Sequence, residues 1–460
     1  MPMPMPMPMP PSWQRLACFI VVAVFPALIA PAAEPVSFRN DIAPLLLEHC
    51  TSCHGPKKAE GGYRLDSFAQ LSKAGDTGIA PLLVEEEHPS ELIRRLTTDD
   101  EVERMPAERA PLPAKTIELF KRWQSEGSKF DGNDPQSPIF EIVPDPIYPP
   151  SPQVYTAPVP VTAVTFSPDG LHVIASGYHE LTVWDAVSGQ LVRRIQNLPE
   201  RIHALDWSAD RKSLAVSGGS PGRLGEVRII EWESGKIVNC FGRATDVIQA
   251  VRFQPDGQRI ATGNSDGTVR WFDTSDWHLI RSLASHADSV TDVRWSSDGR
   301  HLASASRDKT AKVFDVESGE LLATYSAHAE VVTGICFNEG DKEMTSIGGD
   351  RKVHRWQIEG SKTLAKIDLP AAPIRLLTGN SHAWLTLADN SLREFDLKTS
   401  KLSRQLDGHT GWVTAVCSDF ESRRLASGAL NGEIRMWQMG DKPSSQTWIA
   451  APGFSKPLTN

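Results

Sequence analysis

Two cysteines and a histidine form a short motif whose residue types and spacing predict a specific chemistry. Residues 50 to 54 read Cys50-Thr51-Ser52-Cys53-His54, which is the C-x-x-C-H pattern of covalent haem attachment. Two thiols about one helical turn apart add to the two vinyl groups of a single haem, and the adjacent histidine supplies an axial nitrogen to the iron. The motif therefore predicts one covalently bound haem c, held by Cys50, Cys53 and His54.

The other uses of a C-x-x-C pair are a disulfide, a thioredoxin-like redox pair and half of a zinc site. A thioredoxin-like pair requires a surrounding βαβ pattern, which the flanking sequence lacks. A zinc site requires a second Cys or His pair at a suitable spacing, and none follows residue 54. Haem attachment is therefore the use that the motif favours.

A second axial ligand is expected from elsewhere in the same region, and Met105 is the candidate. It is the only methionine between the haem motif and a proline-rich stretch that begins near residue 133, and the proline after it favours an extended backbone. A thioether is a soft, neutral ligand that favours reduced iron and raises its reduction potential. Two alternatives stay open: Met105 is an ordinary apolar loop residue, or His88 is the ligand. His49 would point to the wrong side of the preceding helix.

Three helices are expected around this motif. Apolar residues at helical spacing predict the first over Phe38 to His49, which delivers the two cysteines, and Gly55-Pro56 ends it. Residues 57 to 75 are charged and contain glycine, which predicts a loop over one edge of the haem. Ser90 to Leu96 predicts the second helix, and Pro113 to Gly127 predicts the third, with proline near its start and glycine just past its end.

Residues 36 to 130 resemble the small cytochrome c domain that is common in planctomycete proteins. The matching segments, in chain order, are residues 50–56 (CTSCHGP), 61–67 (GGYRLDS), 75–78 (GDTG), 90–96 (SELIRRL), Met105-Pro106 and Trp123 to Gly127. The resemblance implies an all-α, class I-like cytochrome c domain with covalent haem, His54 and Met105 as axial ligands, and a secreted setting. One departure is Ala107, where the family often has a second proline.

Residues 1 to 33 are predicted to be a signal peptide. Arg15 supplies the positive charge, Leu16 to Ala30 is an apolar run too short for a comfortable membrane span, and Ala30-Pro31-Ala32 offers a cleavage site. Cys18 does not form a lipoprotein signal because the apolar run follows it. We therefore expect export to the periplasm or cell surface with no membrane span after cleavage; an uncleaved anchor is the alternative.

The net charge bears on nucleic-acid binding, and the remaining cysteines bear on disulfide formation. A net charge of -9 gives no general nucleic-acid footprint, so no nucleic-acid partner is expected. Cys240, Cys336 and Cys417 are scattered among strand-like segments. Such a dispersed, odd set predicts buried free thiols in place of a disulfide framework.

From Val161 onward the chain repeats itself. Each unit ends in an aromatic residue of a strand-like run, namely Trp184, Trp232, Trp271, Phe314, Trp356, Phe395 and Trp437. A β-rich repeat of about 40 residues with tight turns predicts a propeller of four-stranded blades. Seven copies therefore predict an all-β, seven-bladed propeller.

The units resemble WD repeats, as Trp184-Asp185 and Gly408-His409 illustrate. The resemblance implies a structural hydrogen-bond tetrad in three units: His286, Ser304 and Asp308 with Phe314 in place of tryptophan; His328, Ser346, Asp350 and Trp356; and His409, Ser427 and Trp437 with Asn431 in place of aspartate. Because these histidines recur once per unit, we interpret them as architectural. The second and sixth units are degenerate, so units one, two and six are expected to be less rigid or to carry insertions.

Residues 133 to 160 contain nine prolines, which argues against a helix or a central strand and predicts an extended, semi-rigid spacer. Apolar residues within it, namely Phe140, Ile142, Ile147 and Tyr155, suggest that it lies partly against a surface; a freely mobile tether is the alternative. The strand that closes the ring is expected either from Thr447 to Ala450 or from residues near Tyr155.

The predicted organisation is a signal peptide (1–33), a cytochrome c domain (34–132), a proline-rich linker (133–160) and a seven-bladed WD-repeat propeller (161–455). The first functional hypothesis is an exported electron-transfer protein whose propeller docks an unknown redox partner protein. The second is a propeller scaffold in which the haem is a redox or ligand sensor or a structural element. The third, catalysis at haem iron, needs an open coordination position. No hydrolase, P-loop or dinucleotide motif offers another activity.

Overall fold

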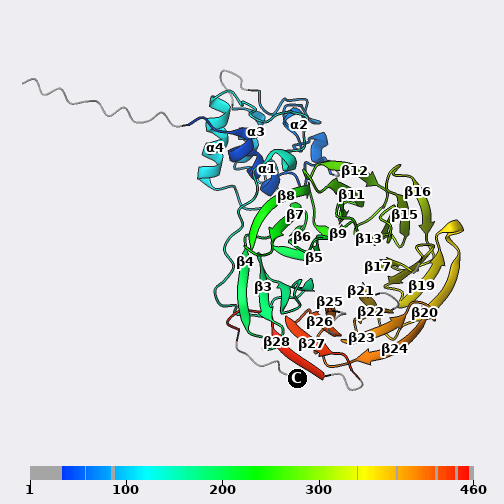
Figure 1. Cartoon of the computed structure of the whole chain (residues 1–460). Helices are drawn as coiled ribbons and strands as arrows, with labels where there is room; N and C mark the ends of the chain where they lie inside the picture. Colours follow the sequence, from blue (N-terminus) through cyan, green and yellow to red (C-terminus); the bar gives the residue numbers. More distant parts are fainter. Residues whose placement is uncertain are drawn as a thin grey trace, which may run out of the picture. The chain divides into compact units, whose positions relative to one another are not determined.

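The computed structural model describes residues 34–56, 58–83, 89–338, 340–379, 382–419, 423–440 and 444–454 (Figure 1). The predicted signal peptide, with Cys18, and the alternative ligand His88 lie outside these residues. Among the described residues, no helix combines the length and the apolar character needed to cross a bilayer.

Short helices make up the region that carries the C-x-x-C-H motif. They are η1 (Phe38–Ile42), α1 (Ala43–His49), η2 (Glu60–Gly62), α2 (Phe68–Leu71), α3 (Glu91–Thr97), α4 (Ala114–Ser125) and α5 (Ile139–Ile142). The three predicted helices are confirmed as η1 with α1, as α3 and as α4. The predicted loop also contains η2 and α2, and the proline-rich stretch contains α5, so the expectation of no helix there is wrong for four residues. Each added helix is about one turn, too short to show a helical period.

Serine and proline residues set where the longer helices begin. The hydroxyl of Ser90 accepts a hydrogen bond from the Ile93 amide at the start of α3 (3.3 Å) and donates to Gln124 of α4 (2.7 Å). Pro113 precedes the first residue of α4, and Gly127, with a φ of 95°, follows its last turn. One serine therefore both starts α3 and joins it to α4.

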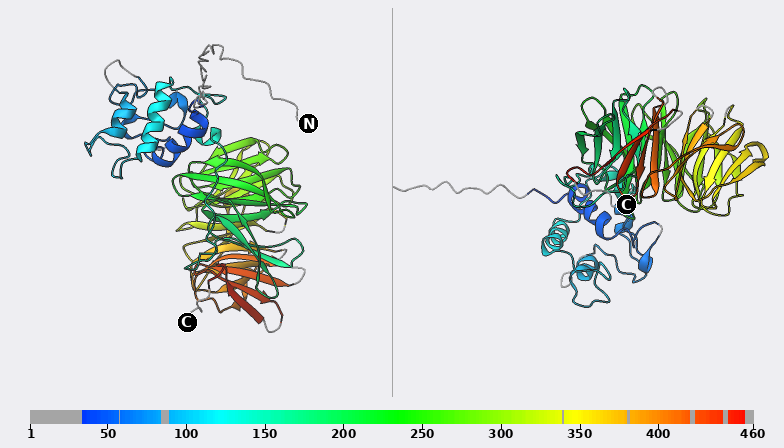
Figure 2. Two further views of the ribbon diagram at one scale, coloured as in Figure 1. Left: turned by 90° about the vertical axis from the view of Figure 1, so that its left-hand side faces the viewer. Right: turned by 90° about the horizontal axis from the view of Figure 1, so that it is seen from below.

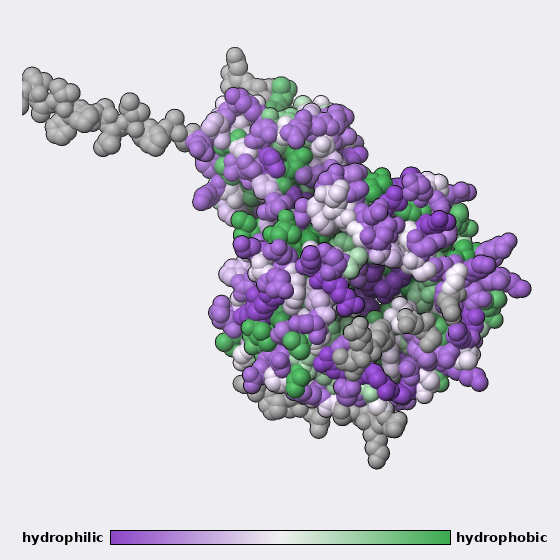
Figure 3. Space-filling model, viewed as in Figure 1, coloured by the Kyte–Doolittle hydropathy of each residue, from purple (hydrophilic) through white to green (hydrophobic). Residues whose placement is uncertain are grey.

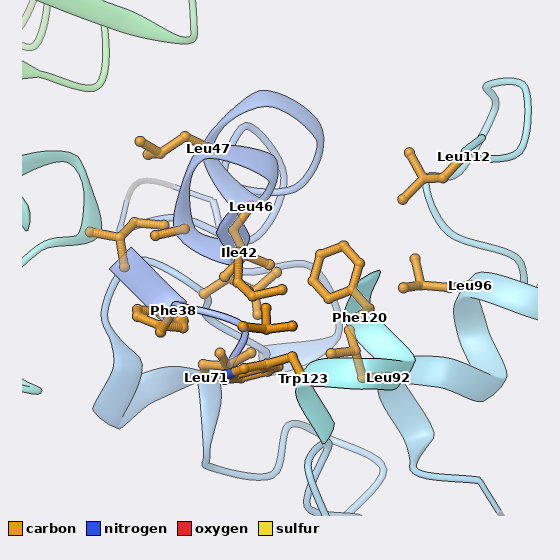
Figure 4. Close-up of a cluster of buried hydrophobic side chains, with 14 of the residues drawn as sticks. Phe38, Ile42, Leu46, Leu47, Leu71, Leu92, Leu96, Leu112, Phe120 and Trp123 are labelled. Atoms are coloured by element: carbon orange, nitrogen blue, oxygen red, sulfur yellow. The ribbon is translucent and has the colours of Figure 1, made fainter. Parts of the chain in front are cut away.

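The helical region has one hydrophobic core, drawn in Figure 4. Phe38, Ile42 and Leu46 come from the first predicted helix, and Phe120 and Trp123 come from α4; each is at most 1% exposed. The ring centroids of Phe38 and Trp123 are 5.6 Å apart. The apolar faces predicted for the first and third helices therefore meet, and they fix the helix that leads into the motif.

Seven sheets of four antiparallel strands form the rest of the described fold. In chain order the blades are β1 (Val164–Phe166), β2 (His172–Ser176), β3 (Glu180–Asp185) and β4 (Leu191–Gln196); β5 (Arg201–Trp207), β6 (Ser213–Ser220), β7 (Leu224–Glu231) and β8 (Lys236–Ala244); β9 (Ile248–Phe253), β10 (Arg259–Asn264), β11 (Thr268–Asp273) and β12 (Leu279–Ala284); β13 (Val290–Trp295), β14 (His301–Ser306), β15 (Ala311–Asp315) and β16 (Leu321–Tyr325); β17 (Val332–Phe337), β18 (Glu343–Gly348), β19 (Lys352–Gln357) and, after the turn η3 (Glu359–Ser361), β20 (Thr363–Asp368); β21 (Pro373–Thr378), β22 (His382–Leu387), β23 (Leu392–Asp396) and β24 (Lys401–Leu406); β25 (Val413–Asp419), β26 (Arg424–Ala429), β27 (Glu433–Gln438) and β28 (Ser444–Ile449).

The first strand of each blade is the innermost. β1 contacts β5, β5 contacts β9, and the series continues through β13, β17, β21 and β25 back to β1. These seven strands enclose the central channel, and Figure 2 shows the sheets from the side. The seven-bladed propeller is therefore confirmed, with the repeating aromatic residue on the third strand of each blade or, for Trp232, directly after it.

The ring closes between the first and seventh blades. The outer strand of the seventh blade is β28, so the first of the two closure alternatives is confirmed. The backbone amide of Val161 donates to the carbonyl of Ala429 (3.1 Å), and β1 packs against β25. Both ends of the propeller sequence therefore meet at this one junction.

The fifth blade contains the complete predicted tetrad. His328 lies 2.9 Å from the Ser346 hydroxyl through Nε2 and 3.0 Å from the Asp350 carboxylate through Nδ1, and the Trp356 indole donates to the same serine (3.2 Å). The fourth blade repeats the histidine bonds with His286, Ser304 and Asp308. The histidines therefore tie loops to strands within their blades, which supports the architectural interpretation.

The seventh blade departs from the predicted tetrad. Asn431 donates to the Thr410 hydroxyl (2.8 Å), and the fully buried Glu433 lies 3.4 Å from His409 Nδ1. Burial opposes the charge of Glu433, but the neighbouring His409 and the hydrogen bonds from Arg435 hold its pKa at about 2. The role assigned to Asn431 is therefore taken by an acid two residues later.

Propeller arginines bind the proline-rich stretch, whose residues 144–155 are termed the strap. Arg228 donates to the carbonyl of Pro146 (2.6 Å), and Arg194 donates to that of Pro152 (2.7 Å). Proline lacks an N–H but keeps its carbonyl acceptor, so a proline-rich segment suits arginine donors. The surface-packed interpretation is confirmed for the strap, and the mobile-tether alternative is wrong.

Two strap tyrosines bind buried acids in the first two blades. The Tyr155 hydroxyl donates to Glu180 (2.6 Å), and the Tyr148 hydroxyl donates to Glu226 (3.1 Å); both acids are 0% exposed. Here the strap supplies hydrogen-bond donors to buried acids, as Arg435 does for Glu433 in the seventh blade. Ile147, which was also expected to contact the surface, is 89% exposed.

Replacing Tyr155 with phenylalanine is expected to destabilise the propeller by about 1–3 kcal/mol, because it leaves a buried acid without one of its donors. Tyr178→Phe is the control, since that side chain is 40% exposed and its expected change is within about 0.5 kcal/mol. Urea unfolding followed by tryptophan fluorescence measures both. Equal changes in the two variants would show that the strap contact carries no stability.

A second buried histidine lies beside the tetrad of the fifth blade. The rings of His354 and His328 stack with centroids 3.8 Å apart and planes 9° apart, and among the described residues His354 Nε2 has no hydrogen-bond partner. Ligand-type atoms of these two histidines and Asp350 lie within 4.8 Å of one another, but parallel rings keep their in-plane lone pairs from converging on one ion. Burial, and then the neighbouring His328, lowers the pKa of His354 to about 3.

Propeller stability is therefore expected to fall as the pH drops from about 6.5 toward about 3. In this window the unfolded chain binds a proton at His354 and the folded chain does not, which costs about 1.4 kcal/mol per pH unit. Urea unfolding at pH 6.5 and 4.5 measures the loss, and His354→Gln should remove about 2.3 kcal/mol of it. The control His278→Gln, at an exposed histidine, should leave the loss of stability between these two pH values unchanged. Identical pH dependence in both variants would contradict the assignment.

Candidate functional site

The C-x-x-C-H motif forms a helical turn directly after α1. The amide of Cys50 donates to Leu46 (2.9 Å), and the amides of Cys53 and His54 both donate to the carbonyl of Cys50 (3.2 and 3.0 Å). Cys50 is half-buried, Cys53 is exposed, and both are free thiols. Two reduced thiols therefore lie one turn apart beside an imidazole, as haem attachment requires.

The ring of His54 is oriented by a backbone carbonyl. Its Nδ1 lies 3.2 Å from the carbonyl oxygen of Tyr63, which only accepts hydrogen bonds, so Nδ1 carries the proton. In the neutral imidazole this arrangement leaves the lone pair on Nε2, which is the form in which imidazole binds a metal. The Tyr63 hydroxyl donates to the carbonyl of Leu71 (3.0 Å), which fixes the tyrosine.

Gly55 follows the histidine because a side chain does not fit there. A Cβ at this position would lie 2.5 Å from the carbonyl oxygen of Thr51. The Gly55 amide donates to the carbonyl of Lys58 (2.8 Å), which turns the chain out of the helical direction. The predicted end of the first helix at Gly55-Pro56 therefore has a steric cause.

Burial sets the protonation of the first cysteine. Burial, and then the neighbouring Cys53, raises the pKa of Cys50 to about 12. Cys50 is therefore a neutral thiol at physiological pH. Burial also raises the pKa of the nearby Tyr63 hydroxyl.

Met105 lies on the same core as the motif. Its side chain is half-buried and packs, like those of Cys50 and Tyr63, against the hydrophobic core of the helical region. The Met105 amide donates to the carbonyl of Arg95 at the end of α3 (2.8 Å). The backbone of Met105 is therefore hydrogen-bonded to α3.

Ion pairs hold the loop that ends at Met105. Glu91 accepts hydrogen bonds from Arg94 (2.7 Å) and Arg95 (2.7 Å), and Arg94 also bonds Glu103. The hydrogen bond from Arg94, with that from Arg95, outweighs burial and holds the pKa of Glu91 at about 2. The i,i+3 and i,i+4 spacing of Glu91 to the arginines was readable in the sequence, whereas the contact with Glu103 had no local signal.

These residues fit a haem. Two free thiols at the required spacing, a histidine whose Nδ1 is held by a backbone carbonyl, and a thioether on the same core provide the donor set of a c-type centre. Sequence reasoning missed the Tyr63 carbonyl, because the contact runs through the backbone of a residue nine positions away.

The fold and this donor set define a cytochrome c-type helical domain combined with a WD-type propeller. Residues 50–108 match the planctomycete cytochrome C family, and residues 151–185, 277–315 and 400–438 match the WD domain, G-beta repeat. Residues 240–295 match the WD40 domain of anaphase-promoting complex subunit 4. The chain therefore carries a planctomycete-type cytochrome c domain and a WD-repeat propeller.

Curated relatives match shorter parts of the chain. A target of rapamycin complex subunit of Schizosaccharomyces pombe is 33% identical over 102 residues, which is 22% of this chain and 32% of the relative. A target of rapamycin complex subunit of Saccharomyces cerevisiae is 28% identical over 102 residues (22% and 33%), and a guanine nucleotide-binding protein subunit beta of Oryza sativa subsp. japonica is 28% identical over 116 residues (24% and 30%). The chain thus spans about a third of the length of each.

Proposed function

We propose that this protein is an exported c-type cytochrome that passes single electrons, with a propeller that docks its redox partner. Cys50 and Cys53 hold one haem c, and His54 and Met105 are its axial ligands. The observation that carries the proposal is the His54 ring, whose Nδ1 bond to the Tyr63 carbonyl leaves Nε2 free beside two reduced thiols. When bound, the haem supplies a one-electron redox centre.

The protein residues have distinct tasks in this proposal. The two cysteines prevent dissociation, and the Tyr63 carbonyl keeps His54 in one tautomer and raises its basicity as a ligand. As the second ligand, Met105 would favour the reduced state and would leave no open site for peroxide or small-molecule chemistry. The Arg94–Glu103 ion pair and the hydrogen bond from Arg95 to the Glu103 carbonyl (3.4 Å) keep the Met105 segment on α3.

The docking role of the propeller rests on its class. WD propellers generally mediate protein–protein contacts, and the matched relatives are named as subunits of complexes. The partner proposed here is a redox protein outside the cytoplasm, in the periplasm or at the cell surface. Export, the signal peptide over residues 1–33 and the domain limits 34–132, 133–160 and 161–455 belong to the same proposal.

Optical spectra of the oxidised and reduced protein, with carbon monoxide added to the reduced form, test the proposal. A low-spin spectrum with a Met–iron charge-transfer band and no carbon monoxide shift is expected. A high-spin spectrum that shifts with carbon monoxide would mean an open iron. That result would favour the second candidate, a propeller scaffold in which the haem is a sensor, over electron transfer.

A further inference from the structure

Three arginines on first strands lie in the central channel: Arg252 on β9, Arg294 on β13 and Arg375 on β21. Figure 3 shows a hollow at the centre of the ring with strongly hydrophilic residues around it. Arg294 donates to the carbonyl of Leu376 on β21 (3.1 Å), and Arg375 donates to that of His203 on β5 (3.2 Å). These bonds join blades that are not neighbours, so the side chains reach across the channel.

The positive charges in the channel outnumber the carboxylates. Asp292 lies 3.3 Å from Arg294 Nε and 3.8 Å from Arg252 Nη2. Burial raises the pKa of Asp206, the other acid in this cluster. Among the described residues no carboxylate forms an ion pair with Arg375, and Asp292 acts on this guanidinium only at longer range. Three guanidinium groups thus face two acids, and Arg375 has no ion-pair partner.

The same arginines have unused hydrogen-bond donors. A guanidinium carries five N–H groups. In the described part of the chain, the shielded Nε atoms of Arg252 and Arg294 have no hydrogen-bond partner, and the Arg375 side chain makes one hydrogen bond. Burial, and then the charge of Arg294, lowers the pKa of Arg252 to about 10. An anion with acceptor oxygens would neutralise the excess positive charge of these arginines and accept hydrogen bonds from their unpaired N–H groups.

We propose that the central channel binds a small oxyanion, a phosphate or carboxylate group, with Arg375 as its main ligand and Arg252 and Arg294 as further donors. The paired N–H groups of a guanidinium match two oxygens of such a group. This site uses no residue of the cytochrome domain and is independent of the haem. It is partly open to solvent, because the Arg252 and Arg294 side chains are each 20% exposed.

Calorimetric titration of the full-length protein with inorganic phosphate at fixed ionic strength tests the site. Arg375→Met is expected to raise the dissociation constant at least tenfold. Arg404→Met is the matched control, since Arg404 lies on the outer strand β24 beside Glu394 (3.8 Å), and it should leave the constant unchanged. Asp292→Asn removes the competing acid and should tighten binding.

Acetate in place of phosphate distinguishes the two sources of the anion. Binding of acetate alone supports a carboxylate ligand, and binding of phosphate alone supports a phosphate. The proposal is wrong if neither anion binds better than chloride, or if Arg375→Met binds phosphate like the wild type. If Arg375→Met does not fold, unchanged affinity in Asp292→Asn overturns it.

Discussion

The double variant Cys50→Ala/Cys53→Ala is expected to lose all covalently attached haem. Each thioether bond needs one thiol, so neither bond forms in this variant, and the single variants retain at most one. Haem staining after denaturing electrophoresis measures attachment, and intact-mass spectrometry counts the bound groups. The wild type should keep one haem through denaturation.

The control for this experiment is Cys240→Ala. The Cys240 thiol donates to the buried Glu226 in the second blade (3.2 Å), and its loss perturbs the propeller alone. Haem staining of this variant should equal that of the wild type. Covalent haem that survives in the double variant would refute the assignment of the motif.

Met105→Ala is expected to keep the haem attached while lowering its reduction potential and opening the iron. Loss of a tenfold preference for reduced iron lowers the potential of a one-electron couple by about 59 mV, and we expect at least this change. Redox titration measures the potential, and carbon monoxide binding to the reduced form measures the open position.

Two further variants make the Met105 result specific. Met439→Ala removes a methionine from the seventh blade, where it packs against a separate core, and should change neither reading. His88→Ala tests the alternative ligand and should also leave both readings unchanged. If Met105→Ala behaves like the wild type and His88→Ala does not, the ligand assignment moves to the histidine.

The sequence predicts those residues of the haem site whose spacing is fixed by covalent attachment. Cys50, Cys53 and His54 are recognisable because one haem fixes the distance between its two vinyl groups and its iron. The orientation of His54 was not predictable, because its partner is the main-chain carbonyl of Tyr63, which any residue type could supply. The structure places Met105 on the same core, and its ligation stays a prediction.

The propeller was predictable where each blade repeats one sequence pattern. It was not predictable where a residue outside that pattern forms the equivalent hydrogen bond or ion pair. The period near 40 residues predicted seven blades, which the structure has, and the tetrad predicted around His328 is complete. Glu433 lies two residues from the expected position, and Tyr155 precedes Val161, where the repeats were predicted to begin. A buried acid needs a hydrogen-bonding or charged partner, which any part of the chain can supply. Comparison of the repeats reveals only partners that occupy equivalent positions in each blade.

Closure of the ring has a consequence for how the protein is made. Val161 and Ala429, which meet where the ring closes, lie at opposite ends of the propeller sequence. At about 5–20 residues per second, their synthesis is separated by tens of seconds. During that interval β1 has no seventh blade to pack against, so the growing ring presents an incomplete face to other chains. The last blade to be synthesised therefore ends the period in which the nascent chain is most prone to aggregate.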